Sequence, residues 1–379
     1  MRRLEDWARV PAAEMAHLYR VEHERWRRDL DWDTSETLEA LERARLNGRV
    51  PGFVARQTSG GAAGWTYYVL QGSELQIGAL VASSPGTTAS LLDAVLGSAA
   101  ATVASRTLFF AHSDAPGIAD ALARRGFAVT AEHYLSRPLD LAHTLDLGPR
   151  AIAALPTWHD DDVAAAAQLF QDAYGGPDAT RAFAPGNSLA DWHGYVQQLT
   201  GATGCGRFLP ALSPVLRSGD GRLDGAALVT AVSNTSAHLA QLAVRASRSG
   251  EGLGAQLLAA ALAGAQRAGY ARLSLLVNDA NVRARHLYAG AGFEARGTFV
   301  SATRPRQRAR VMTPVEPAAG RSAAAVDERG VVERRREHAA IGGEGRLALL
   351  EAGERGAPRQ FGIGERLHRL FVGGENARD

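Results

Sequence analysis

The spacing of apolar residues changes along the first third of the chain, from a helical repeat to the alternation of strands. Residues 1–46 carry apolar positions at helical intervals among charged ones, which predicts helices. From Gly52 onward the apolar runs are shorter and are separated by Gly, Ser or Pro, as is typical of strands joined by turns. The pattern predicts strands at 53–56, 64–70, 74–81, 107–110 and 131–135, with one helix at 88–104 and another that ends near 123–127.

A similar order of elements recurs in the second half of the chain. Asp160, Asp161 and Asp162 precede a helix that extends to Tyr174, and acidic residues at a helix start complement its dipole. Later elements are strands at 225–232, 238–244 and 273–277, helices at 255–268 and from Asn281 to about 292, and final strand residues at 299–300 and 309–312. This period is too long for a solenoid and indicates a duplicated domain.

A glycine cluster, Ser249–Gly254, lies between the strand at 238–244 and the helix at 255–268. Glycine lets the backbone approach a ligand closely, and the first amides of a helix have no acceptor inside it. These N–H groups and the positive helix end favour phosphate oxygens. The unit therefore predicts an anion site.

Three types of phosphate site are possible for this cluster. A P-loop needs a lysine at the helix start, and all 42 basic residues of this chain are arginine. The dinucleotide pattern Gly250-x-Gly252-x-x-Ala255 is present, but no acidic residue follows in the next strand to hold a ribose. The third type is a loop for the diphosphate of coenzyme A.

Two stretches resemble the GNAT family of acyl-CoA N-acyltransferases in residue type and spacing. They read Val244-x-x-x-x-Ser249-Gly250-x-Gly252-Leu253-Gly254 and Asn278-Asp279-Ala280-Asn281-x-x-Ala284-x-x-Leu287-Tyr288-x-x-x-Gly292-Phe293. The first departs from the family, which usually has Arg or Gln where Ser249 stands and Pro where Ala246 stands, while Arg248 comes one position early. This departure bears on affinity for the diphosphate more than on the fold, because such a loop binds mainly through backbone amides.

The resemblance implies an α/β (α+β) fold with two GNAT-like domains, each a mixed, mainly antiparallel sheet flanked by helices. We expect a degenerate domain at 1–142, a catalytic domain at 150–314 and a disordered, low-complexity tail at 315–379, which is rich in Arg, Glu, Gly and Ala. In the first domain, Ser83–Thr88 has one glycine, and Pro85 removes an N–H donor. We therefore expect that it has lost coenzyme binding; the alternative is an unrelated α/β domain that caps the active one.

The resemblance further implies that the chain transfers an acetyl group from acetyl-CoA to a primary amine by direct attack in a ternary complex. Residues expected to bind the cosubstrate are Leu242, Ala243 and Val244 through their backbone, Ser249, Gly250, Glu251, Gly252, Leu253 and Gly254 in the loop, and Asn278 and Asn281. For Asn281, the resemblance implies a bond to the pantetheine arm, and the alternative is a simple helix N-cap, which needs one assumption fewer. The other function considered is a non-catalytic acyl-CoA-binding or regulatory protein, because Ser249 replaces Arg.

Two residues are the catalytic candidates. Tyr288 stands where the family has the acid that protonates the departing thiolate, and a phenol with a pKa near 10 stays protonated at neutral pH; the alternative is a core aromatic. His238 is the candidate base, because alternation along its strand places it on one face with Ala240, Leu242 and Val244. It could also be structural, and His193 and Asp191 are weaker candidates.

Composition and charge limit the classes of binding partner to be expected. A net charge of +2 gives no reason to expect nucleic-acid binding. Cys205 is the single cysteine, so no internal disulfide forms, and we expect a structural thiol in a cytoplasmic protein. No apolar run has the length of a signal sequence or membrane span. The abundance of Arg, Ala and Gly is typical of a GC-rich bacterial genome. We expect a small-molecule amine or a peptide N-terminus as acceptor and no metal; the oligomeric state stays open.

Overall fold

A computed structural model of the chain describes residues 3–112, 114–140, 155–174, 184, 187–201 and 205–305. These residues fall in one compact unit. Two predictions, the strand residues 309–312 and the tail at 315–379, lie outside the described residues.

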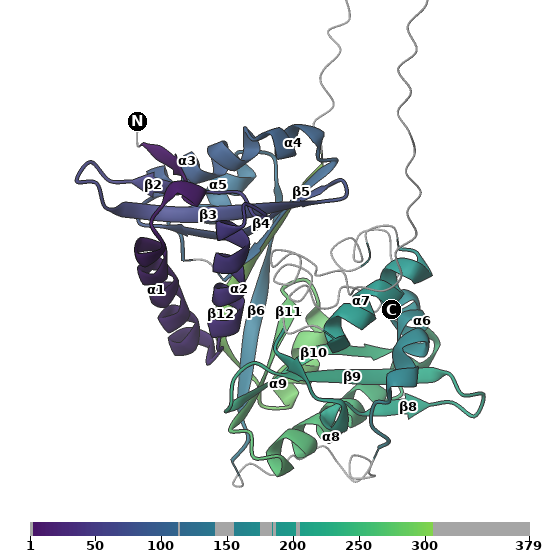
Figure 1. Ribbon diagram of the computed structural model, residues 1–379. Coiled ribbons are helices and arrows are strands. Elements are labelled where there is room, and N and C mark those ends of the chain that lie inside the picture. The colour runs from purple at the N-terminus through teal and green to yellow at the C-terminus, as the bar shows by residue number, and fades with distance from the viewer. Residues whose placement is uncertain are drawn as a thin grey trace, which may run out of the picture. The chain divides into compact units, whose positions relative to one another are not determined.

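The elements follow the predicted order closely (Figure 1). The first segment contains β1 (Leu4–Asp6), η1 (Trp7–Arg9), α1 (Ala12–Leu30), α2 (Ser35–Leu46), β2 (Gly52–Arg56), β3 (Ala62–Gln71), β4 (Glu74–Ala82), α3 (Pro85–Leu96), α4 (Ala99–Val103), β5 (Arg106–Ala111), α5 (Ile118–Ala123) and β6 (Ala128–Pro138). The second contains η3 (Asp160–Asp162), α6 (Val163–Tyr174), α7 (Leu189–Gly201), β7 (Arg207–Phe208), η4 (Pro210–Leu212), β8 (Val215–Arg217), β9 (Leu223–Ala231), β10 (Ser236–Val244), η5 (Ala246–Arg248), α8 (Leu253–Arg267), β11 (Arg272–Asn278), α9 (Val282–Gly290) and β12 (Glu294–Pro305).

One expected helix is divided in two. The pattern predicted a continuous helix at 88–104, but α3 ends at Leu96 and α4 begins at Ala99. Gly97 caps the end of α3, and the Ser98 side chain accepts a hydrogen bond from the Ala101 amide at the start of α4. The division therefore follows from a helix-stopping glycine next to a good N-cap residue.

The strands of the described residues form a single sheet in the order β1-β2-β3-β4-β5-β12-β6-β11-β10-β9-β7, with β8 beside β9. Among these neighbours, β4–β5 and β10–β11 are parallel and the other pairs are antiparallel. The expected mixed, mainly antiparallel sheet with flanking helices is thus confirmed.

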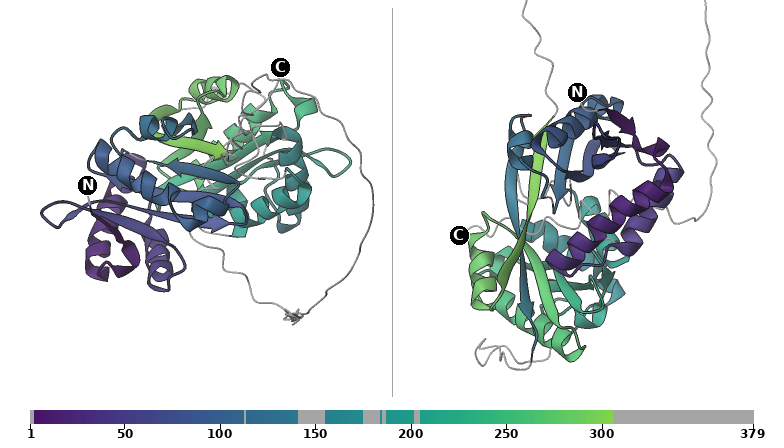
Figure 2. Two further views of the ribbon diagram at one scale, coloured as in Figure 1. Left: turned by 90° about the horizontal axis from the view of Figure 1, so that it is seen from above. Right: turned by 90° about the vertical axis from the view of Figure 1, so that its left-hand side faces the viewer.

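The last strand of each segment lies in the other segment's part of the sheet. β12 pairs with β5, so that Val300 lies opposite Ala111, while β6 pairs with β11, so that Glu132 lies opposite Asn278. β6 and β12 also pair with each other. Figure 2 shows the green β12 running beside the blue strands of the first segment. The sheet is therefore continuous through this exchange, and the division into domains at 1–142 and 150–314 stays a prediction.

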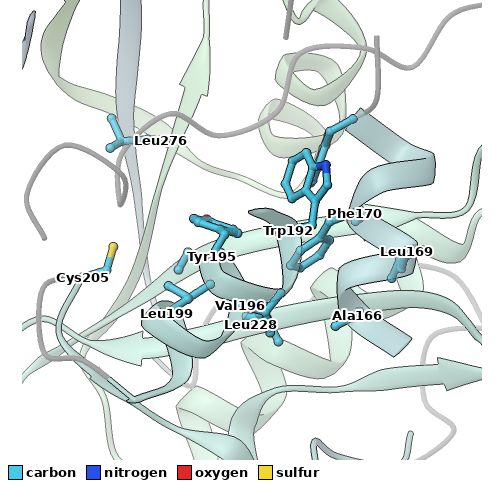
Figure 3. Packing of buried hydrophobic residues seen from close by; sticks show 14 of the residues in the cluster. Ala166, Leu169, Phe170, Trp192, Tyr195, Val196, Leu199, Cys205, Leu228 and Leu276 are labelled. Atoms are coloured by element: carbon cyan, nitrogen blue, oxygen red, sulfur yellow. The ribbon is translucent and has the colours of Figure 1, made fainter. Parts of the chain in front are cut away.

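Helices cover both faces of the sheet in the second segment. α6 and α7 pack on one face with an aromatic-rich core that includes Phe170, Trp192 and Tyr195 (Figure 3). α8 and α9 pack on the opposite face, where Leu257, Leu262 and other apolar side chains meet β9, β10 and β11. β10 therefore has a helix pair on each side.

Cys205 belongs to the first of these cores (Figure 3). Its side chain is buried, and burial raises the pKa of the thiol, so it stays protonated at neutral pH. Among the described helices, none combines the length and apolar character that a membrane span requires.

Candidate active site

The parallel strands β10 and β11 separate part-way along their length. Their pairing covers Ser236 to Leu239 on β10 and ends where Leu239 lies opposite Leu275, although β10 continues to Val244 and β11 to Asn278. A pocket of about 300 Å³ occupies this gap, and residues 239–244 and 276–277 form its walls. The loop at 248–255 and one side of α9 complete the lining.

A β-bulge at Ala240 sets the direction of the backbone in the gap. The register between β10 and β9 shifts between Leu239 and Gln241, after which Leu242 lies opposite Ala227. The Ala227 amide donates to the Pro214 carbonyl on the far side of β9, at 2.9 Å. The backbone N–H and C=O of Leu242 therefore point away from β9 and into the gap that β11 has left.

The glycine loop leaves the start of α8 open. Gly250 and Gly252 have φ values of 90° and 84°, in the left-handed region that suits glycine. Gly252 is the N-cap and has no side chain to cap the helix, and the first helical bond runs from the Gln256 amide to the Gly252 carbonyl at 3.1 Å. The amides of residues 253–255 therefore have no acceptor within the helix and border the pocket.

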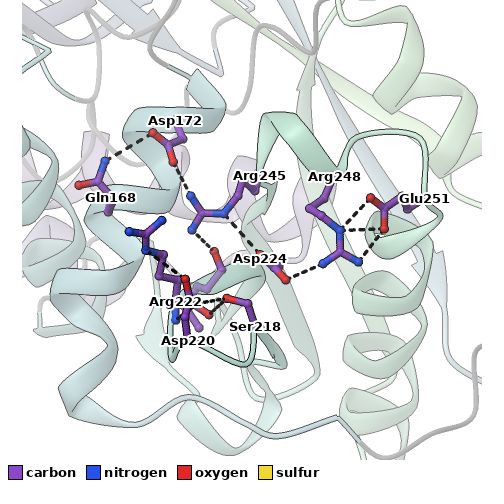
Figure 4. Close-up of polar contacts among 10 residues, drawn as sticks. Gln168, Asp172, Ser218, Asp220, Arg222, Asp224, Arg245, Arg248 and Glu251 are labelled. Atoms are coloured by element: carbon purple, nitrogen blue, oxygen red, sulfur yellow. Dashed lines mark hydrogen bonds and ion pairs between the residues drawn. The ribbon is translucent and has the colours of Figure 1, made fainter.

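Two arginines line the pocket beside this loop and differ in their partners. Arg248 is held by Glu251 and by Asp224, with shortest contacts of 2.6 and 2.7 Å (Figure 4). The Glu251 carboxylate turns toward Arg248, and Glu251 does not line the pocket. Arg283, in the first turn of α9, bonds to the Ser249 hydroxyl and has no carboxylate partner among the described residues. Arg283 is therefore the more available cation at this site.

Tyr288 reaches the pocket from α9. Its side chain is 7% exposed and its ring lies 5.8 Å from that of Phe293. Burial raises the pKa of its phenol above the ordinary value of 10, so Tyr288 is protonated throughout the neutral range. It can act as a proton donor to a group bound in the gap.

Tyr174 faces the same pocket from the last turn of α6. Its hydroxyl donates to the Leu242 carbonyl at 2.7 Å. Neither Tyr174 nor Arg283 was predicted from the sequence. Arg283 could have been found from its place two residues after the N-cap Asn281, but nothing in the pattern around Tyr174 distinguishes it from a core aromatic.

His238 does not line the pocket. Its ring stacks on Tyr134 at 6.0 Å, lies 5.2 Å from Trp32, and bonds through Nδ1 to the Ser274 hydroxyl at 3.0 Å. Burial lowers the pKa of His238 to about 3, which makes it a weak proton acceptor. The prediction that His238 lies on the same strand face as Leu242 and Val244 is wrong. The bulge at Ala240 shifts the register, so the side chains after it point to the opposite face from the one that simple alternation gives.

The two asparagines of the motif have different roles. Asn281 lines the pocket and caps α9 by accepting from the Ala284 amide at 3.0 Å, so the N-cap role is confirmed. Asn278 lies outside the pocket lining; it donates to Glu132 of β6 at 2.7 Å and accepts from the Ala280 amide at 2.8 Å. The exchanged strand of the first segment thus holds the turn that leads into α9.

Of the remaining candidates, some line the pocket and others lie outside it. Asp191 accepts from the Ser188 amide at the start of α7, and neither Asp191 nor His193 lines the pocket. Leu242, Ala243, Val244, Ser249, Gly250, Gly252, Leu253 and Gly254 all do. In the described part of the chain, no group of three or more His, Cys, Asp or Glu side chains is arranged to hold a metal ion.

Residues 163–293, from α6 to Phe293, match the family model described as the acetyltransferase (GNAT) family. Among solved structures, a GCN5-related N-acetyltransferase from Sphaerobacter thermophilus aligns with a TM-score of 0.58 and 17% identity, over 80% of this chain and 95% of that one. A GCN5-related glucosamine N-acetyltransferase region of a fungal multi-domain GH3 β-N-acetylglucosaminidase aligns with a TM-score of 0.54 and 15% identity, over 80% of this chain and 38% of that one. At these identities the likeness concerns the fold. The comparison with curated proteins gave no match.

Proposed function

We propose that this chain transfers an acetyl group from acetyl-CoA to a primary amine; the match of residues 163–293 to the acetyltransferase (GNAT) family model supports this proposal. The amine, of a small molecule or a peptide N-terminus, attacks directly while both substrates are bound in the gap between β10 and β11. The observation that carries the proposal is the meeting of three features in one pocket: the Leu242 backbone, the open start of α8 and Tyr288.

The loop is suited to the diphosphate of the cosubstrate. The amides of residues 253–255 and the positive end of α8 favour an anion, and Gly250 and Gly252 leave no side chain between it and the backbone. Arg283, next to Ser249, supplies the charge that the family usually has at position 249. Asn281 borders the path from the loop to Tyr288 and is the proposed partner of the pantetheine arm. Acetyl-CoA itself supplies the activated acyl group as a thioester.

The reaction moves one proton from nitrogen to sulfur. The amine nitrogen bonds to the thioester carbonyl carbon, the carbon–sulfur bond breaks, and its electron pair goes to sulfur. The Leu242 N–H donates to the thioester oxygen as that oxygen gains charge. Tyr288 gives its proton to the departing sulfur and recovers one from the nitrogen, so it ends the cycle protonated.

The amine reacts in its neutral form. The titratable side chains in the described lining of the pocket are Tyr174, Arg248, Arg283 and Tyr288. Arginine stays protonated, and burial raises the pKa of both phenols. None of these groups takes a proton readily from an ammonium ion at neutral pH, so the acceptor is deprotonated before it attacks.

Two measurements on the full chain test this function. Calorimetry with acetyl-CoA tests cosubstrate binding, and thiol release from acetyl-CoA is then followed with a panel of small amines, aminoglycosides and peptides with free N-termini. The proposal requires binding and at least one amine that accelerates thiol release. Absence of heat with well-folded protein contradicts it.

The second candidate is a non-catalytic acyl-CoA-binding or regulatory protein. Two features favour this function, because each lowers the positive charge that the loop offers to a diphosphate. Ser249 stands where the family usually has Arg, and the charge of Arg248 is opposed by two carboxylates. Acetyl-CoA binding without turnover across the whole amine panel would support it.

A further inference from the structure

Tyr174 presents its hydroxyl to the pocket in a fixed orientation. Its ring stacks on Trp192 of α7 with centroids 6.0 Å apart and lies 5.8 Å from the ring of Phe170 on its own helix, so two aromatic rings pack against it. The side chain is 7% exposed. Its Oη lies 2.7 Å from the Leu242 carbonyl oxygen, in the part of β10 that no longer pairs with β11.

This geometry limits what the hydroxyl can do. A tyrosine hydroxyl has one proton and two acceptor positions. The proton is directed at Leu242, so Tyr174 is a poor proton donor to a bound substrate. Its lone pairs remain and border the pocket, close to where the Leu242 N–H points into the gap.

The two tyrosines that line the pocket therefore differ in whether the hydroxyl can donate a hydrogen bond to a substrate or only accept one. Tyr288 comes from α9, on the other face of the sheet, and its hydroxyl has no hydrogen-bond acceptor among the described residues. The Tyr174 hydroxyl donates its proton to the Leu242 carbonyl, and its oxygen can still accept a hydrogen bond. Burial and the neighbouring Tyr288 raise the pKa of Tyr174, so its oxygen does not ionise in the neutral range.

We propose that the Tyr174 hydroxyl accepts a hydrogen bond from the N–H of the acceptor amine and so orients the nitrogen lone pair toward the thioester carbon. This inference rests on the proposed function. It makes Tyr174 a substrate-orienting residue, and it requires an uncharged amine that keeps an N–H while its lone pair attacks. Correct orientation lowers the barrier without any change in how tightly the cosubstrate binds.

A purely structural role for Tyr174 leads to a different expectation. If the hydroxyl only held Leu242 in place, its loss would disturb β10, which forms a wall of the cosubstrate pocket. Acetyl-CoA affinity would then fall, and hydrolysis of acetyl-CoA in the absence of amine would fall with it, since both depend on the Leu242 backbone.

The test compares Tyr174→Phe with Tyr195→Phe in the full chain. Tyr195 lies on α7 in the same aromatic cluster, and its hydroxyl accepts from Gln241, but it does not line the pocket. Three quantities are measured for each variant: the calorimetric Kd for acetyl-CoA, kcat/KM for the best amine, and the rate of thiol release without amine. For Tyr174→Phe we expect kcat/KM for the amine to fall about 10-fold, the loss of one neutral hydrogen bond with its orientation, while Kd and hydrolysis stay within about twofold of wild type. Tyr195→Phe should leave all three within about twofold.

The outcomes separate the two levels of the proposal. Wild-type protein that neither binds acetyl-CoA nor releases thiol removes the proposed function and this inference with it. Wild-type activity with an unchanged kcat/KM in Tyr174→Phe, or with Kd and hydrolysis impaired together, overturns the inference alone. Tyr174→His, which keeps an aromatic ring with an acceptor nitrogen, should recover part of the amine kcat/KM; it also serves if the phenylalanine variant does not fold.

Discussion

The two segments share one backbone plan, but only the second keeps it open for a ligand. In the first, β4 and β5 pair in parallel from Glu74 to Ile77 and then separate, with a register shift beside Gly78, much as β10 and β11 do beside Ala240. There, however, a Cβ on Gly78 would lie 2.1 Å from the Tyr67 ring, and the space in the gap is about 40 Å³ instead of about 300 Å³. Aromatic side chains fill the first gap.

The helices that follow β4 and β10, α3 and α8, also differ in how their first N–H groups are satisfied. Ser84 caps α3 by accepting from the Thr87 amide at 3.3 Å, and Pro85 at the first helical position has no N–H to offer. α8 begins with Gly252 and Leu253, which leave the amides uncapped. The N–H groups at a helix start therefore stay available to an anion only where no capping side chain or proline occupies that start, as at α8.

The largest effect is expected at Tyr288, because the first segment has no tyrosine at the corresponding position. Leu122 stands at the same distance before Gly126-Phe127 as Tyr288 does before Gly292-Phe293. We expect Tyr288→Phe to lower turnover about 100-fold or more, the usual contribution of a positioned acid, with acetyl-CoA affinity within about twofold. Steady-state kinetics and calorimetry measure the two effects. Wild-type turnover in this variant would remove the acid role.

The next largest effect is expected when α8 receives a proline at its first helical position, as α3 has. Leu253→Pro should be tolerated by the helix, because proline suits the first helical position, but it removes one N–H from the proposed diphosphate site. We expect acetyl-CoA to bind about 10-fold more weakly, as for one charge-assisted hydrogen bond. Leu253→Ala is the control that loses the side chain and keeps the amide. Equal affinities in the two variants would mean that this amide does not contact the ligand.

A smaller effect should separate the two arginines beside the loop. Arg283→Gln is expected to weaken acetyl-CoA binding about fivefold and to reduce its dependence on salt, because the guanidinium is exposed and partly screened. Arg248→Gln should change affinity less, since its charge is already opposed by Asp224 and Glu251. Titrations at low and high ionic strength measure both, and acetyl-pantetheine, which has no phosphate, should bind the wild type and Arg283→Gln equally. The reverse ranking of the two variants would return the role to Arg248.

The smallest effect on catalysis is expected at His238. His238→Gln should keep turnover within about twofold, and the pH–rate profile should show no inflection near 6.5 that belongs to this residue. Stability should respond instead: the folded pKa of about 3 lies below the unfolded value of about 6.5, so the unfolded state binds more protons between these values. Wild-type stability therefore falls as the pH drops below about 6.5, and the variant should lack that part of the loss. Thermal unfolding from pH 8 to pH 5 tests this; an inflection near 6.5 in wild-type rates that disappears in the variant would restore His238 as the base.

The local sequence pattern was sufficient to predict many elements of the second segment. The strand before Ser249, the glycine loop, the apolar helix and the Asn281 cap were each predicted, because each depends on residues next to one another in the chain. The loss of an open loop in the first segment followed from Pro85 for the same reason.

The features that were not predicted depend on residues far apart. The bulge at Ala240 is set by the pairing of β10 with β9, and it moved His238 away from the pocket. Tyr174 reaches Leu242 across 68 positions of sequence, and Arg248 is held by Asp224 across 24. The exchange of β6 and β12 is also invisible in the pattern, since an apolar strand has the same alternation whichever neighbour it pairs with.

The exchanged strands have a consequence for how the chain is made. The edge of β5 is covered by β12, the last described strand, so during synthesis from the N-terminus this edge waits through the emergence of nearly two hundred further residues, as the pairing of Ala111 with Val300 requires. Until β12 has emerged β5 lacks one of its two neighbours, and until β11 has emerged β6 lacks both; unpaired edges of this kind invite aggregation. The two segments can therefore complete the sheet only together, and a ribosome that stalls after the first would release a protein with its sheet unfinished.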